Sequence, residues 1–195
     1  TLNWWIHLGT LFLFANELPY SKHFHVYTSV FNVFFANLDA PGKLPSMDLE
    51  EIDDDTTFGI STATDFTWKQ MLDIYTCTEC GRCEERCPAD MTGKPLSPKQ
   101  VVHDTKIDLF DQSSAILTKD NEAVEPLLRE TSPITPDVLW SCTPCRACED
   151  ICPVNIQHLD ILLEARKYQV LMESAFPPEM QETFTNLENQ SNPWG

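Results

Sequence analysis

The sequence predicts an all-α protein, and three of its features support this prediction. Helix-initiating signals recur along the chain, as at Ser97-Pro98, where a capping residue precedes a proline at the first helical position. Apolar residues recur at helical spacing between these signals. No segment alternates apolar and polar side chains convincingly, as a half-buried strand does. With 195 residues, the chain has room for one domain, or for one small domain with an appendage.

Residues 1–38 are predicted to be an N-terminal membrane or amphipathic helical segment. They contain only two charged side chains, Glu17 and Lys22, and 10 of the 20 aromatic residues. The apolar run at 2–18 has about 17 residues, the short limit for spanning a bilayer, and Pro19 then kinks or ends the helix. Residues 24–38 place aromatic side chains at helical spacing. This pattern fits a buried core helix, but the aromatic density favours a bilayer interface.

Residues 39–66 are predicted to be an acidic linker. Six acidic residues occupy the eight positions 48–55, and Pro41-Gly42 and Pro45 interrupt regular structure before them. Such a run is usually solvated and carries no chemistry of its own.

Residues 67–176 are predicted to be the folded domain, and 177–195 a polar exit segment. Helices are expected to start after Ser97, where Gln100 closes a capping box, and after Thr135. Asn155 is expected to cap a long helix that runs to about Glu173.

The overall charge argues against some partner classes. The chain has 30 Asp and Glu against 13 Lys and Arg, for a formal net charge of −17. Nucleic-acid phosphates are bound by Lys and Arg, so the balance argues against a nucleic-acid partner. It also argues against docking on anionic lipid through a basic patch. The acidity fits a solvated surface, or a field that steers a basic partner protein.

All eight cysteines fall in two runs of the form C-x2-C-x2-C-x3-C-P, repeated at an offset of 65 residues. In this bacterial ferredoxin run, three cysteines hold one [4Fe–4S] cluster and the fourth ligates the other cluster. Each cluster therefore takes ligands from both runs and links them, so cluster binding also contributes to folding. The predicted ligands are Cys77, Cys80, Cys83 and Cys152 for cluster 1, and Cys142, Cys145, Cys148 and Cys87 for cluster 2.

Structural zinc and a disulfide framework are the alternatives for these cysteines. Zinc sites use paired C-x2-C elements with four thiols per ion, which leaves the x3-C-P part of each run without a purpose. A secreted disulfide framework would scatter its cysteines through a smaller, loop-rich chain. Two motifs that use every cysteine indicate a reducing compartment.

His7 and His25 are candidate ligands of a haem b. They are 18 residues apart, so one continuous helix would place them on the same side, about 27 Å apart. This nearly equals the hydrocarbon thickness of a bilayer, so each histidine would sit near one membrane face. The alternative is that both are ordinary polar residues near a membrane surface. His103 and His158 are expected on helix surfaces.

Two stretches resemble known families. The run Cys77-Thr-Glu-Cys-Gly-Arg-Cys and its downstream partner resemble the iron–sulfur part of heterodisulfide-reductase-related proteins, over residues 67–176. This resemblance implies an α-helical ferredoxin domain. Trp5-Ile-His7 through Leu18-Pro-Tyr-Ser-Lys-His-Phe-His25 resembles the last membrane helix of the nitrate-reductase gamma-subunit cytochrome b family. In that family, a histidine near each end of the helix ligates a b-type haem, and these positions fall on His7 and His25.

The resemblances together imply electron transfer through two [4Fe–4S] clusters in a membrane-bound, quinone-linked oxidoreductase of the heterodisulfide-reductase type. Some such proteins resemble electron-transfer-flavoprotein:menaquinone oxidoreductases. The expected partners are a flavoprotein or a cysteine-rich CCG domain, and the membrane quinone pool, with the cluster domain on the cytoplasmic side. The alternative is a soluble iron–sulfur subunit that docks on such a partner without haem. No substrate-converting site is visible, because the six glycines form no G-x-G or P-loop and no nucleophile-and-base set stands out.

Overall fold

The computed structural model describes residues 1–39, 43, 56–120, 123–129, 132 and 134–195. Among these residues the one extended pairing is an isolated bridge between Thr62 and Pro126, so the all-α prediction is confirmed. The predicted acidic run at 48–55 lies outside the described residues. The α-helices are α1 (Leu2–Glu17), α2 (His25–Phe34), α3 (Trp68–Thr76), α4 (Arg82–Glu85), α5 (Pro88–Met91), α6 (Pro98–Asp111), α7 (Ser113–Thr118), α8 (Pro136–Ser141), α9 (Ala147–Asp150), α10 (His158–Leu171) and α11 (Met180–Gln190).

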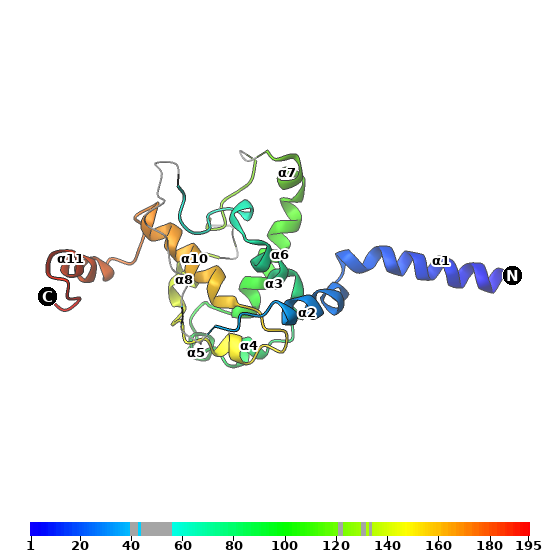
Figure 1. The fold of residues 1–195 in the computed structure, drawn as a ribbon, viewed down its shortest axis with the longest axis horizontal. Helices are drawn as coiled ribbons and strands as arrows, with labels where there is room; N and C mark the ends of the chain where they lie inside the picture. Colours follow the sequence, from blue (N-terminus) through cyan, green and yellow to red (C-terminus); the bar gives the residue numbers. More distant parts are fainter. Residues whose placement is uncertain (40–42, 44–55, 121–122, 130–131, 133) are drawn as a thin grey trace.

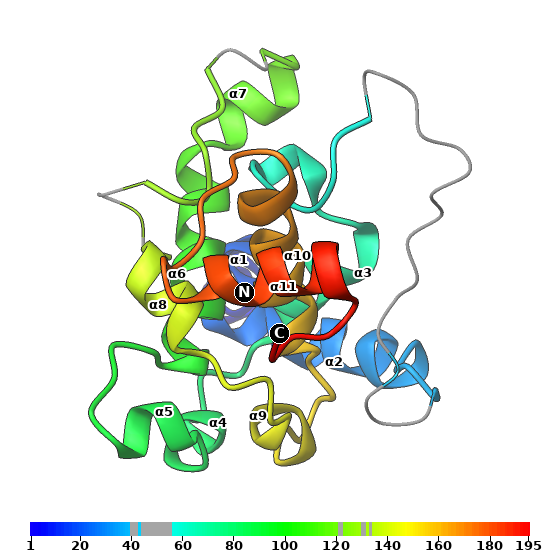
Figure 2. The ribbon, with the colours of Figure 1, turned by 90° about the vertical axis from the view of Figure 1, so that its left-hand side faces the viewer.

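A central body carries the cysteines, and a helix extends from each end of it (Figure 1). α1 projects on the N-terminal side, and α11 lies on the opposite side beside the C-terminus. Seen along the long axis, α5, α4 and α9 lie along one edge of the body, and α7 lies at the opposite edge (Figure 2). The largest cluster of buried apolar side chains comes from α6, α8, α10 and the segments between helices, and includes Ile60, Leu96, Val101, Leu127, Ile134, Leu139, Leu162 and Ala165.

The two cysteine runs have matching local structures. α3 ends directly before Cys77, and α8 ends directly before Cys142. Each run then enters a one-turn helix, α4 or α9. The residue before each of these turns has a left-handed backbone, with φ of 81° at Gly81 and 63° at Arg146. α4 and α9 contact each other, so the sequence repeat becomes a paired structure at one edge of the body.

Two predicted helix starts are confirmed, with one difference in detail. Ser97 accepts a hydrogen bond from the backbone N–H of Gln100 at 3.2 Å, and Thr135 accepts one from Val138 at 3.4 Å. The Gln100 side chain does not close a capping box. It instead donates to both carboxylate oxygens of Asp104 at 2.7 Å.

The predicted start of the long helix is wrong. Asn155 has φ of 55° and stands outside α10, which begins at His158. The carboxylate of Glu149, on α9, accepts a hydrogen bond from the backbone N–H of Leu159 at 3.0 Å. A carboxylate from another helix therefore accepts from one N–H of the first turn of α10, the role that a local capping side chain would otherwise take.

The N-terminal helices are present but are not continuous. Two 3₁₀ turns, Leu18–Tyr20 and Lys22–Phe24, separate α1 from α2. Pro19 lies in the first turn, where its missing N–H is tolerated. His7 therefore lies on α1 and His25 begins α2, so the expectation of one helix carrying both is wrong. In the part of the chain that the structure describes, no helix is both long and apolar enough to cross a lipid bilayer.

α2 packs on the body through its polar side. Thr28 and Asn32 are its buried residues, and Asn32 is 0% exposed. The Asn32 amide donates to Asp73 Oδ1 at 2.8 Å and to the Val154 carbonyl at 2.9 Å. The aromatic residues of α2 point outward instead, with Phe34 79% exposed. The alternative of a buried core helix at 24–38 is therefore wrong.

The end of the predicted linker packs closely on α10. The backbone N–H of Ile60 donates to the Glu164 carbonyl at 3.1 Å, and the Ile60 side chain is buried. Gly59 makes this approach possible. A Cβ there would lie 2.2 Å from the Glu164 carbonyl oxygen and 2.5 Å from the Tyr168 nitrogen, and its φ is +81°.

We expect Gly59→Ala to destabilise the cluster-loaded chain by about 3 kcal/mol. About 1 kcal/mol comes from the left-handed backbone and about 2 kcal/mol from overpacking against α10. The matched control is Gly93→Ala, which has φ of +75° but whose Cβ would meet no described atom within 4 Å. Anaerobic thermal unfolding should show a fall in Tm of about 9 °C for Gly59→Ala and about 3 °C for the control. Equal falls would contradict the close approach.

Candidate functional site: two four-cysteine sites

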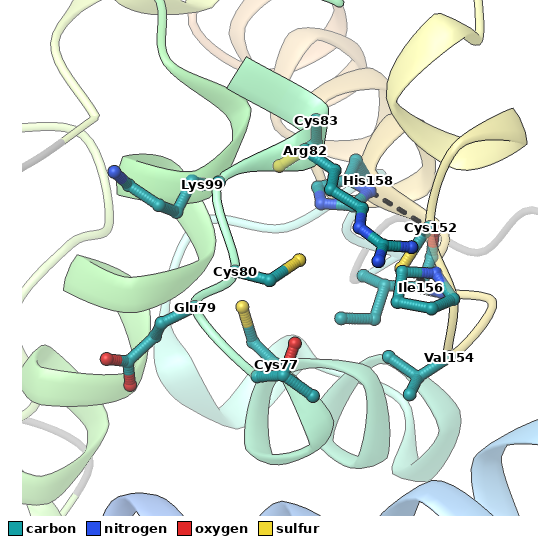
Figure 3. A pocket seen from close by; sticks show the side chains of 13 residues that line it. Cys77, Glu79, Cys80, Arg82, Cys83, Lys99, Cys152, Val154, Ile156 and His158 are labelled. Atoms are coloured by element: carbon teal, nitrogen blue, oxygen red, sulfur yellow. Dashed lines mark hydrogen bonds between the residues drawn. The ribbon is translucent and has the colours of Figure 1, made fainter. Parts of the chain in front are cut away.

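Four cysteines from the two runs line one cavity. Cys77, Cys80 and Cys83 come from the first run and Cys152 from the second, and the cavity encloses about 290 Å³ of space between protein atoms, part of it open to solvent. Figure 3 shows the four side chains around this space, with His158 beside them. Among the described residues, no three metal-binding side chains converge on one point. A four-iron cluster instead takes its thiolates at separate iron atoms.

The other four cysteines also lie close together. Cys87 and Cys142 pack in the same apolar cluster, although they belong to different runs. Burial raises the pKa of the Cys142 thiol to about 11, the charge of Arg166 lowers it, and the neighbouring Cys87 and Cys145 raise it. The structure thus brings each fourth cysteine beside the first cysteine of the other run, as the crossed sets require. Ligation itself stays a prediction.

The second and third cysteines have the same burial in both runs. The second cysteine of each run, Cys80 or Cys145, is exposed, whereas the third, Cys83 or Cys148, is buried. Cys83 and Cys148 also lie near enough for the charge of one thiol to raise the pKa of the other, although burial is the main cause. The two sites are therefore neighbours inside the body, and each reaches solvent at the second cysteine of its run.

The cysteine surroundings fit thiolate ligands. Burial favours the neutral thiol at Cys80, but the Arg82 backbone N–H, the Thr78 hydroxyl and the Arg82 charge together lower its pKa below the ordinary value. The backbone N–H of Ile156 donates to the Cys152 sulfur at 3.4 Å. Such donors stabilise thiolates and tune clusters.

Burial acts in the opposite direction at the inner cysteines. It raises the pKa of Cys83 to about 12, with help from the charges of neighbouring cysteines. Metal binding requires the thiols to lose their protons. The buried sites therefore favour thiolates only when a cationic iron core replaces those protons.

Two glutamates at matching positions tie the cysteine loops to the long helices. Glu84 follows Cys83 and accepts a hydrogen bond from Ser97, the N-cap of α6, at 2.9 Å. Glu149 follows Cys148 and binds the first turn of α10. The sequence alone predicted no role for either glutamate. The repeated Cys-Glu pair at an offset of 65 was the signal that would have revealed this shared structural role.

The histidines divide into three environments. His7 is exposed on α1, and His25 is half-buried, with its Nδ1 2.6 Å from the Lys22 carbonyl oxygen. His103 is half-buried beside Asp104. The expectation for His158 is wrong, because it is 3% exposed and lines the cysteine cavity. Burial lowers its pKa to about 4, so it is neutral near pH 7.

Arg166 binds the backbone where α8 ends and the second cysteine run begins. Its guanidinium donates to the Leu139 carbonyl at 3.1 and 2.7 Å and to the Cys142 carbonyl at 2.6 Å. It also lies 5.0 Å from the ring centre of Trp140, over its face. These carbonyls end α8 and have no acceptor role within the helix, so Arg166 replaces the missing helical donors.

We expect Arg166→Gln to destabilise the cluster-loaded chain by about 2 kcal/mol, because the shorter amide cannot reach both carbonyls. The matched control is Lys167→Gln on the same helix, which removes a partly exposed ion pair with Glu164 and should cost under about 1 kcal/mol. Anaerobic thermal unfolding should show a fall in Tm of about 6 °C for Arg166→Gln. A fall no larger than that of the control would contradict this role of the Arg166 hydrogen bonds.

Comparisons with known proteins agree with the two-cluster site. Residues 76–156 match the family model described as 4Fe-4S dicluster domain. An EtfAB:quinone oxidoreductase of Syntrophomonas wolfei is 34% identical over 213 residues, which cover 100% of this chain and 29% of the relative. A probable membrane-anchored ferredoxin of Chromohalobacter salexigens is 36% identical over 165 residues, or 78% of this chain and 24% of the relative.

A third relative comes from the heterodisulfide reductases. One subunit of the ferredoxin:CoB-CoM heterodisulfide reductase of Methanosarcina mazei is 30% identical over 100 residues, which cover 51% of this chain and 48% of that relative. The chain spans less than half the length of each of these three relatives. No solved structure matches the chain significantly. Residues 76–156 are thus similar to 4Fe-4S dicluster domains, and the chain is similar to parts of a quinone oxidoreductase and of a heterodisulfide reductase.

Proposed function

We propose that this chain transfers electrons through two [4Fe–4S] clusters within a larger oxidoreductase. The observation that supports this most directly is the pair of neighbouring four-cysteine sites, each with one exposed cysteine. When bound, the clusters supply one-electron carriers. The chain's own residues hold the thiolates, shield the inner side of each site and leave Cys80 and Cys145 at the surface.

The test is a dithionite-reduced minus air-oxidised optical spectrum of the anaerobically purified chain, with iron and sulfide analysis. We expect broad bleaching and about eight iron atoms per chain. A chain that binds zinc and does not bleach would contradict the proposal.

We further propose that the oxidoreductase is membrane-bound and quinone-linked. The apolar outward surfaces of α1 and α2 support this, as does the likeness to a protein named a probable membrane-anchored ferredoxin. The relative named EtfAB:quinone oxidoreductase supports a flavoprotein partner on one side and quinone on the other. A CCG-domain partner rests instead on the resemblance to heterodisulfide-reductase-related proteins. The cluster domain would then lie on the cytoplasmic side.

His7 and His25 remain the candidate haem b ligands in this proposal. Each would need a partner histidine from other helices, so the test uses the complete native polypeptide extracted from membranes with detergent. A sharp b-type band in the reduced spectrum that is lost in His7→Ala or His25→Ala would support haem ligation. Bleaching without that band would instead favour the alternative, a soluble two-cluster subunit without haem that docks on the same partners.

A further inference from the structure

α2 has its polar and apolar sides reversed relative to a surface helix of a water-soluble domain. Thr28 and Asn32 face the body and are 7% and 0% exposed. Tyr27, Val30, Phe31 and Phe34 share one face at i, i+3, i+4 and i+7 spacing and are 57–79% exposed. An ordinary amphipathic helix buries the apolar side. The outward face of α2 is therefore built for apolar surroundings.

The neighbouring sequence extends this apolar surface. No Asp, Glu, Lys or Arg occurs between Lys22 and Asp39. α1 continues the surface, with Trp4, Phe12 and Phe14 each more than half exposed. Apolar and aromatic side chains on a helix that lies flat are typical of binding in the headgroup region of a bilayer. The chain's net charge of −17 makes neutral phospholipid the better fit.

We propose that α2 lies along the membrane–water interface, with Tyr27, Val30, Phe31 and Phe34 toward the acyl chains of neutral phospholipid. This inference rests on the proposed membrane-bound function and adds the surface and orientation that it uses. A second copy of the chain or another protein segment is the competing occupant. The many exposed apolar side chains of α1 and α2, with few charges among them, favour lipid over the smaller, polar-rimmed patch of a protein contact.

This orientation places a predicted ligand loop close to the bilayer. On its inner side α2 holds the Val154 carbonyl through Asn32, and Val154 is two residues after Cys152. At the start of α2, Phe24 packs edge-to-face on Tyr75 with ring centres 6.3 Å apart. One helix diameter, about 10 Å, then separates the Cys152 loop from the membrane side. α2 thus acts as a spacer between the bilayer and the first four-cysteine site.

The test measures which solvent surrounds α2 in vesicles. Nitroxide labels are placed at Val30→Cys and Phe34→Cys in the cluster-loaded full chain, with Thr118→Cys on exposed α7 as the matched control. An unsubstituted chain treated with the same reagent checks that the cluster cysteines do not react. The chains are reconstituted in phosphatidylcholine vesicles with oxidised, diamagnetic clusters. EPR power saturation then compares collisions with oxygen and with a water-soluble nickel chelate.

We expect a severalfold higher oxygen-to-nickel collision ratio at positions 30 and 34 than at 118. Nickel access at 30 and 34 equal to that at 118 would overturn the proposal and place α2 in water. Labels shielded from both oxygen and nickel would also overturn it, because a protein surface would then cover the helix. Dithionite bleaching of the same samples reports on the clusters separately, so loss of the proposed electron-transfer function is distinguishable from a wrong orientation of α2.

Discussion

A chain carrying both Cys77→Ser and Cys152→Ser is expected to keep one intact cluster, whereas a chain carrying Cys77→Ser and Cys87→Ser is expected to lose both. The crossed sets predict this difference, because the first pair removes two ligands from one site and the second pair removes one ligand from each. The structure supplies the basis, since Cys152 lines the cavity of Cys77 and Cys87 packs with Cys142.

Iron and sulfide analysis after anaerobic purification measures the outcome directly. The first pair should retain about four iron atoms per chain and the EPR signal of one reduced cluster. The second pair should retain little iron. Cys142→Ser with Cys87→Ser is the matched control, because it again removes two ligands from a single site.

The opposite result would mean that each run builds its own cluster. In that case the Cys77 and Cys87 pair would keep about four iron atoms, and the Cys77 and Cys152 pair would lose both clusters. Circular dichroism of each variant separates this outcome from unfolding, because a chain that has lost its helices cannot report on ligand pairing. The measurement therefore decides the pairing, even though both schemes use the same eight cysteines.

The parts of the fold that were predictable come from local sequence signals. Ser97 and Thr135 start helices because their hydroxyls bind backbone N–H groups three residues away, within the same segment. The 65-residue repeat predicted two similar loops, and the structure gives both the same left-handed residue before the one-turn helix, at Gly81 and Arg146. Local geometry of this kind depends on neighbouring residues alone.

The features that sequence reasoning missed depend on distant partners. Glu149 accepts from an N–H in the first turn of α10, whereas Asn155 stands outside the helix. His158 is buried beside the cysteine loops, at the wall of their cavity, which helical spacing alone does not reveal. The aromatic spacing of α2 predicted a helix with one apolar face, but only the packing of Asn32 shows that this face points away from the body. Tertiary contacts decide each of these cases.

Asn32→Leu is expected to destabilise the cluster-loaded chain by about 4 kcal/mol, the largest loss among the stability variants. The substitution keeps the size of the side chain but removes one donor from the buried Asp73 carboxylate and one from the half-buried Val154 carbonyl, at about 2 kcal/mol each. Burial already raises the pKa of Asp73, and the bonds from Lys69 and Asn32 oppose that rise. Without Asn32, one of these opposing bonds is lost. Anaerobic thermal unfolding should show a fall in Tm of about 12 °C.

Thr28→Val is the matched control on the same face of α2. The Thr28 hydroxyl bonds only weakly, to the carbonyl of Phe24 directly before α2 at 3.4 Å, so its loss should cost under about 1 kcal/mol. Equal losses in the two variants would mean that Asn32 does not hold α2 on the body.

A second measurement tests whether the Asn32 contact reaches the predicted cluster ligands. Asn32 binds the Val154 carbonyl, and the backbone N–H of Ile156, in the same loop, donates to the Cys152 sulfur. Because hydrogen bonds to ligand sulfurs tune a cluster, Asn32→Leu should change the EPR line shape of the cluster held by Cys152. The other predicted cluster has no ligand in this loop and should keep its signal. A change in both signals would indicate general loosening of the body, and a change in neither would mean that α2 anchors the chain without influencing the site that it covers.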